Sequence, residues 1–265
     1  MADDPRTRAR EAMAARFGEA PDASDMPEIP PGLDALLDRR ACRRFRAEPV
    51  PEPLLHLVLA TGFAAPSKSD LQQADMVWVR DPAIRAEVTR DCGDWLAEAP
   101  AEVEILVVCG DGRRLRRLYG PDWANDHVDA LFNPTGDAAI LLGQLVSAAT
   151  LAGLGACPIS VMRNRAEAVS AALALPERVF PFAGLAIGWA AAPRAPISPR
   201  LGPAGALHID RFDADGQDAA VAAYDARRGP VGKGASWTDA KRHQYSTAQR
   251  AGWGAFLRAK GFRME

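Results

Sequence analysis

An arginine-rich segment is the first candidate for chemistry. The sequence RRACRRF places Arg39, Arg40, Arg43 and Arg44 within six consecutive residues. Each guanidinium group offers paired N–H donors in a fork that matches the oxygens of a phosphate. The segment therefore predicts a local anion site. The simpler interpretation is a solvated surface whose arginines form ion pairs, and the segment alone leaves both open.

A second candidate is the polar loop APSKSDLQQ at residues 65–73. Pro66 is expected to end the preceding helix. The residues that follow it carry hydroxyl, ammonium, carboxylate and amide groups: Ser67, Lys68, Ser69, Asp70 and Gln72. Such a loop can bind a polar ligand, but it can equally be an ordinary connection between two elements.

Two further segments are weaker candidates. GACPISVMRN, at 155–164, is a predicted strand end beside a long apolar helix, a common place for a ligand to lie. PISPRLG places Arg200 between a proline and a glycine, and the simpler interpretation is a rigid surface turn.

Other common chemistries lack their motifs. The sequence has four scattered histidines without an HxxxH pair and four cysteines without a CxxC pair, so no metal site is predicted. Ser160 lies in no GxSxG motif, which argues against a serine hydrolase. The segment GDGRRL lacks the third glycine of a dinucleotide-binding loop.

The elements that must position these residues are mixed helices and strands. Apolar runs predict strands at 74–81, 103–111, 155–162 and 182–190. Helical spacing predicts helices in the N-terminal lead-in and at 52–65, 81–96, 165–175, 218–228 and 238–265. Residues 33–47 are expected to form a short helix that runs into the arginine cluster. Because helices and strands do not alternate regularly, we predict an α+β fold with a mostly antiparallel central sheet.

The clearest helix begins near NPTGD at 133–137. Apolar residues recur at helical spacing from Ala138 to Ala152. Asn133 or Thr135 is the expected N-terminal cap, and Gly153 or Gly155 the expected end. Small and apolar residues occur on more than one side, which indicates a buried central helix and allows a role in a subunit interface.

Bulk composition excludes several classes of protein. The chain has 265 residues, 48% of them hydrophobic, and a net charge of -2, which does not suit a nucleic-acid-binding protein. No apolar run approaches the roughly 20 residues that span a bilayer, and the N-terminus has no apolar signal core, so we expect a cytoplasmic protein. We predict an N-terminal arm at 1–32, a core at 33–228, and a flexible connection with a helical extension at 229–265.

The order and spacing of these segments resemble those of FMN-dependent nitroreductases. Residues 39–79 resemble the family's opening, a His/Arg-Arg-Ser-x-Arg-x-Phe start, a helix, and a Pro/Ser-rich loop ending in Leu-Gln. Residues 136–164 resemble its central helix and flavin-facing strand, and 172–202 the block that ends in a Lys-Pro-Arg-like phosphate contact. The tail, 236–262, is similar to the C-terminal extension of the larger, NADPH-preferring branch.

The resemblance implies FMN at a homodimer interface. By position, the FMN phosphate would be bound by Arg39, Arg40, Arg43 and Arg200. The ribityl chain and ring would contact the loop residues Ser67, Lys68, Ser69 and Gln72, and the strand end Pro158, Ile159, Ser160 and Val161 would lie near flavin N5. Arg227, Arg228 and Lys233, beside a Gly-rich connection, are candidates for the 2′-phosphate of NADPH.

Several residues depart from the family's pattern. Ala41 stands where serine is usual, and Ser198 where lysine precedes Pro-Arg. Arg39, where histidine is common, offers a compensating charge. Ser160-Val161 replaces a Gly-Gly pair, which adds side chains where close backbone approach is expected.

The resemblance implies that FMN carries hydride from NAD(P)H to a small acceptor, such as a nitroaromatic or a quinone, in a ping-pong cycle. No acid–base side chain is then required, which fits the lack of such a constellation. One alternative is another flavin chemistry on the same scaffold: flavin reductase, dehalogenase or dehydrogenase. The other is a non-catalytic flavin- or nucleotide-binding protein.

Overall fold

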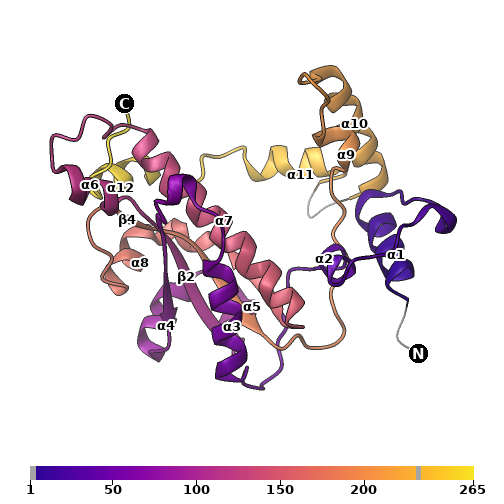
Figure 1. Cartoon of the computed structure of the whole chain (residues 1–265), viewed down its shortest axis with the longest axis horizontal. Coiled ribbons are helices and arrows are strands. Elements are labelled where there is room, and N and C mark those ends of the chain that lie inside the picture. The colour runs from indigo at the N-terminus through magenta and orange to yellow at the C-terminus, as the bar shows by residue number, and fades with distance from the viewer. Residues whose placement is uncertain (1–3, 231–233) are drawn as a thin grey trace. The chain divides into compact units, whose positions relative to one another are not determined.

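The computed structural model describes residues 4–230 and 234–265. The chain divides into two compact units. Figure 1 colours the chain by residue number, from indigo at the N-terminus to yellow at the C-terminus. The helical unit comprises Met1–Arg40 and Pro196–Gln249, and the sheet unit comprises Ala41–Ala195 and Arg250–Glu265. These boundaries differ from those of the three segments predicted from the sequence, and that functional division stays a prediction.

The sheet unit is built on four strands. They are β1 (Ala74–Val79), β2 (Glu104–Asp111), β3 (Gly155–Ile159) and β4 (Val179–Gly188). The strand order is β1-β2-β4-β3, and every neighbouring pair is antiparallel. All four predicted strands are present, and the sheet is antiparallel as expected.

The central strand β2 is buried on both faces. Leu106 and Val108 point into one apolar cluster, while Ile105 and Val107 point into another. All four side chains are fully buried, because alternate residues of a strand face opposite sides of the sheet. The apolar run in the sequence is continuous because alternate residues of β2 pack into two different apolar clusters.

Helices cover both faces of this sheet. The first cluster is completed by α3 (Glu52–Phe63) and α7 (Asp129–Leu151), which pack against each other and run side by side in Figure 1. The second is completed by α4 (Pro82–Thr89), α5 (Asp94–Ala97) and α8 (Ala166–Ala172). Two more helices, α6 (Arg113–Tyr119) and α12 (Trp253–Ala259), belong to the same unit.

The central helix starts earlier than predicted. It begins at Asp129, with Pro134 inside it and no side chain capping its start. Asn133 and Thr135 are therefore not caps; each instead bonds back one turn, to Asp129 and to the carbonyl of Leu131. The predicted end is confirmed, because Gly153 follows the last turn with φ of 75°.

Two other predicted helices are wrong in extent. The helix predicted at 81–96 is two helices, because Asp91 and Gly93 adopt positive φ between them. The tail predicted at 238–265 is α11 (Trp237–Gln244) and α12, separated by turns. The short helix expected before the arginine cluster is α2 (Leu33–Leu37), after which the chain has isolated bridges at Ala41 and Phe45.

The helical unit gathers segments from both ends of the chain. It contains α1 (Pro5–Phe17), α2 (Leu33–Leu37), α9 (Pro203–Ala206), α10 (Ala214–Arg228) and α11. Asp4 and Asp213 cap the first turns of α1 and α10, because their carboxylates accept the backbone N–H groups of Thr7 and Gly216. Across the described residues, no helix has the length and apolar character needed to cross a membrane.

Candidate functional site

The helical unit holds three of the predicted phosphate contacts. Arg39 and Arg40 follow α2 directly, and the exposed Arg200 lies in the segment before α9. An Nη of Arg40 is 2.6 Å from a carboxylate oxygen of Asp38. The Nε of Arg40 is buried and finds no hydrogen-bond partner among the described residues. This unit therefore concentrates guanidinium groups that can receive an anion.

The fourth arginine, Arg43, belongs to the sheet unit. Residues 41 and 42 pair with the edge strand β3: Ala41 bridges Ala156 in parallel, and the N–H of Cys42 donates to the carbonyl of Ala156 at 3.0 Å. Arg43 is exposed, and its guanidinium carbon lies 6.0 Å from the centre of the Trp95 ring. Ala41 is thus held by its backbone, which needs no serine hydroxyl.

The polar loop has an unusual backbone. Ser69, Asp70 and Gln72 adopt φ of 52°, 55° and 50°, a region that non-glycine residues seldom occupy. Inside the loop, the N–H of Gln72 donates to the Ser67 hydroxyl at 3.1 Å, and the Gln72 amide donates to Asp70 at 3.1 Å. Such a conformation persists only when its surroundings hold it.

Asp137, which sequence reasoning did not select, holds this loop. One carboxylate oxygen accepts the N–H of Lys68 at 3.0 Å, and the other accepts the N–H of Gln73 at 2.9 Å. Asp137 lies on α7 and is 4% exposed. A carboxylate that accepts backbone N–H bonds at both ends of a loop fixes the loop's shape. The available signal was an acid on the buried side of a helix, next to Ala138.

The end of β3 is compatible with the Ser160-Val161 departure. Ser160 has φ of -80° and Val161 shows no positive φ, so neither position needs glycine. The Val161 side chain packs against the second apolar cluster, whereas Ser160 is exposed. Pro158 is also exposed, whereas Ile159 is 3% exposed and belongs to the second apolar cluster, so Pro158 and Ser160 are the residues of this strand end that a ligand can reach.

The candidate NADPH arginines bind carbonyl groups of the helical unit. Arg227 donates to the carbonyl of Arg200 at 2.9 Å, and Arg228 donates to that of Pro199 at 2.9 Å and to the Tyr224 hydroxyl at 2.6 Å. They therefore position the Arg200 segment, and their role toward NADPH stays a prediction. Lys233 lies outside the described residues.

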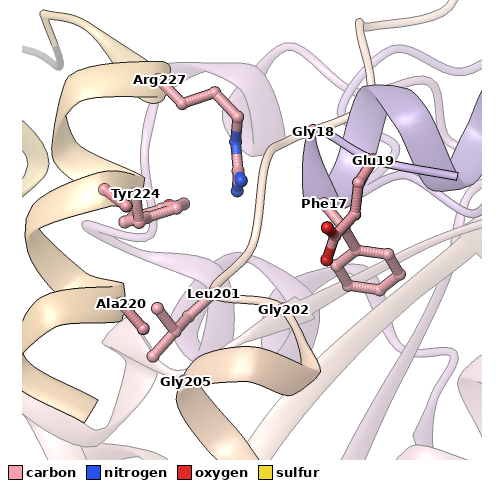
Figure 2. A pocket seen from close by; sticks show the side chains of 10 residues that line it. Phe17, Gly18, Glu19, Leu201, Gly202, Gly205, Ala220, Tyr224 and Arg227 are labelled. Carbon is pink, nitrogen blue, oxygen red and sulfur yellow. The ribbon is translucent and has the colours of Figure 1, made fainter. Parts of the chain in front are cut away.

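A small pocket adjoins these arginines. Its volume is about 190 Å³, below the roughly 300 Å³ at which ligand pockets usually begin. Figure 2 shows Arg227 extended between Tyr224 of α10 and the Phe17–Glu19 turn that ends α1. The pocket shows that the end of α1, the segment 201–202 and α10 converge within the helical unit.

The chain is similar to known proteins of one family. The family model described as Nitroreductase family matches residues 36–189. An FMN reductase [NAD(P)H] of Bacillus subtilis is 29% identical over 201 residues, 73% of this chain and 79% of the relative. An oxygen-insensitive NADPH nitroreductase of Salmonella typhimurium is 28% identical over 215 residues, 79% of this chain and 88% of the relative.

The solved structures agree with this match. The structure of B. megaterium NfrA2 has a TM-score of 0.80 and 25% identity, and it covers 89% of this chain and 100% of that one. The predicted nitroreductase-like α+β fold is confirmed, and so is the resemblance found in the sequence. The family model spans more than half of the chain, and the chain belongs to the Nitroreductase family.

Proposed function

We propose that this protein is an FMN-dependent oxidoreductase that transfers hydride from NAD(P)H to a small acceptor such as a quinone or a nitroaromatic. The observation that carries the proposal is the family match over residues 36–189, which includes the arginine segment, the polar loop and the β3 end. Relatives named as an FMN reductase and an NADPH nitroreductase support both the cofactor and the electron donor.

The residues present fit FMN. Arg39, Arg40 and Arg200 supply the guanidinium groups that a phosphate dianion needs. The buried Nε of Arg40, which has no partner within residues 4–230 and 234–265, is a donor in need of an acceptor. The polar loop supplies the hydroxyl groups of Ser67 and Ser69, which suit a polyhydroxyl chain. The departures at Ala41 and Ser160-Val161 disturb no backbone contact of the structure.

When bound, FMN supplies a two-electron carrier between NAD(P)H and the acceptor. The protein's own contribution is to bind and orient. The arginines neutralise the phosphate, and the loop, shaped by Asp137, presents Ser67, Ser69 and Gln72. The exposed Ser160 would lie beside the ring, where its side chain would limit which acceptors can approach. None of these steps needs a side chain that donates or removes a proton.

We propose further that the protein is a homodimer that uses α7. One face of this helix exposes Phe132, Ile140 and Leu151, which are 72%, 43% and 55% exposed. Gly136 and Gly143 lie on the same face, with open space beside their Cα atoms. Exposed apolar side chains that follow one helix face indicate an interaction surface, and glycines permit close approach of a second helix.

We also propose that the protein acts in the cytoplasm. No disulfide joins its four cysteines, all of which lie in the described part of the chain. This fits a reducing compartment.

Steady-state kinetics test the proposed activity. Purified protein supplied with FMN and NADPH should consume NADPH when benzoquinone, a nitroaromatic or free FMN is added. Initial rates at varied donor and acceptor concentrations should give parallel double-reciprocal lines, because donor and acceptor react in turn at one site. Protein that binds FMN but supports no NAD(P)H oxidation with any acceptor would favour the non-catalytic alternative.

A further inference from the structure

The N-terminal helix α1 is docked firmly within the helical unit. Ala9, Ala12 and Arg16 form its buried face at 0%, 2% and 8% exposure, the spacing of one side of a helix. Arg8 forms an ion pair with the buried Asp34 of α2. The helix is therefore a structural part of this unit and precedes the segment matched by the family model, which starts at residue 36.

Arg16 connects α1 to the segment that carries Arg39. Its Nε and one Nη donate to the carbonyl of Leu37 at 3.2 and 2.8 Å, and that Nη also donates to the carbonyl of Arg39 at 2.5 Å. A guanidinium fork that binds the carbonyls of two nearby residues fixes the direction of the chain between them. The backbone of Arg39 is therefore set by Arg16.

Arg16 also connects α1 to the segment that carries Arg200. The backbone N–H of Arg200 donates to the carbonyl of Arg16 at 2.7 Å. The next residues of α1 reach the same segment, since Phe17 and Gly18 line one pocket with Leu201 and Gly202 (Figure 2). Arg16 thus contacts both chain segments that carry proposed phosphate ligands. Its side chain binds carbonyls of the Arg39 segment, and its main-chain carbonyl accepts the N–H of Arg200.

The charges around Arg16 agree with this geometry. Burial, and then the positive charges of Arg39 and Arg200, lower the pKa of Arg16. Arginine nevertheless keeps its proton in proteins. Three cations held near one another repel each other, and a phosphate dianion beside them relieves that repulsion. Ser198 stands where the family usually has a lysine, so this position lacks a positive charge. The positive charge of Arg16 adds to the attraction for a phosphate and offsets this loss.

We propose that Arg16 is a positioning residue for the flavin phosphate, and that α1 braces Arg39 and Arg200 in the orientation that phosphate binding requires. The inference rests on the proposed FMN function. It predicts an effect on the phosphate alone, because the contacts of Arg16 lead to arginines and to none of the residues proposed for the ribityl chain or ring.

Paired titrations with FMN and riboflavin test this role, since the two flavins differ only by the phosphate. We expect Arg16→Gln to weaken FMN binding about tenfold, equivalent to about 1.4 kcal/mol, and to leave riboflavin affinity within about twofold. Arg6→Gln, which removes an exposed arginine from the same helix, should change neither affinity. Thermal melting of each apo variant verifies folding. If Arg16→Gln unfolds the unit, Arg16→Lys replaces it, and a smaller loss confined to FMN is expected.

The outcomes separate the two proposals. Wild-type protein that binds FMN while Arg16→Gln binds it equally well would overturn the role of Arg16 and leave the function intact. An equal loss of FMN and riboflavin affinity would show a general structural role and would also overturn it. Wild-type protein that binds neither flavin would overturn the proposed function, and this inference with it.

Discussion

At the scale of single residues, the buried acids of the sheet unit fix chain segments that the strands alone leave undefined. Asp137 clamps the two ends of the polar loop. Asp111, at the end of β2, receives three bonds from Arg113: from its backbone N–H at 2.8 Å, from Nε at 2.9 Å and from Nη2 at 2.7 Å. Each acid is satisfied by several donors, as buried charges must be.

Replacing Asp137 by Asn should release the loop. An amide keeps one acceptor oxygen and turns an NH₂ group toward the second N–H, so one end of the clamp is lost. We expect about tenfold weaker FMN binding and, in the apo protein, faster tryptic cleavage after Lys68. Asp122→Asn, which removes an exposed acid from the same unit, is the control. Unchanged cleavage and FMN affinity in Asp137→Asn would contradict the clamp.

The Asp111 carboxylate should make stability depend on acid pH. Burial alone would raise its pKa, but the bonds from Arg113 prevail and lower the pKa of Asp111 to about 2. Because the folded pKa lies below the unfolded one, the stabilisation is present above about pH 4 and is lost as the pH falls toward 2.

Urea unfolding of wild type and Asp111→Asn measures this dependence. The free energy of unfolding should differ by about 2 kcal/mol at pH 7, since one pKa unit is about 1.4 kcal/mol. The difference should shrink below pH 4. A difference that stays constant from pH 7 to pH 3 would mean that the carboxylate's charge is not its source.

At the scale of elements, the contact between α3 and α7 carries the first apolar cluster. Gly62 of α3 faces Leu145 of α7, which is fully buried. A Cβ added at Gly62 would lie 2.3 Å from a terminal carbon of Leu145, closer than carbon atoms approach. The two helices therefore pack so closely at this point that there is room for glycine and for no larger residue.

Gly62→Ala should destabilise the protein even though alanine favours helix formation by about 1 kcal/mol. We expect a net loss of about 1–3 kcal/mol from overpacking, measured by urea or thermal unfolding. Gly252→Ala, at a glycine with open space around it, should stay within about 0.5 kcal/mol of wild type. A gain in stability for Gly62→Ala would show that the helices can separate freely.

Elements with an unbroken pattern were predictable from sequence, whereas their ends were not. The apolar run of β2 and the periodic part of α7 were found because burial imposes their patterns. The early start of α7 was missed because Pro134 resembles a first-turn proline, although it lies inside the helix. The break between α4 and α5 involves Gly93 and also Asp91, a non-glycine residue that adopts φ of 62°, and the conformation of Asp91 has no signal in the local sequence.

The candidate site was predictable where function depends on residue type and not where it depends on distant contacts. The arginines and loop residues were recognisable from their chemistry and order. Asp137 and Arg16 were not, because each acts on backbone groups of residues far away in the sequence. Arg16 in particular looks like one of many arginines in a polar lead-in until the carbonyls of Leu37 and Arg39 are seen beside it.

At the scale of the whole molecule, the exposed face of α7 predicts self-association. Ile140→Glu places a charge in the middle of this apolar face and should shift the dimer toward monomer by at least about tenfold in dissociation constant. Analytical ultracentrifugation measures the shift. Leu118→Glu, at an exposed leucine on α6, is the matched control and should leave the dimer intact. Wild-type protein that sediments as a monomer at micromolar concentration would contradict the dimer.

The measurement closest to the central claim is the visible spectrum of the purified protein before and after NADPH is added without air. We predict a yellow protein that releases FMN on denaturation and whose visible absorption bleaches with NADPH. A protein that is colourless as purified, and that stays so after incubation with FMN and removal of the excess, would contradict the claim that this protein binds FMN.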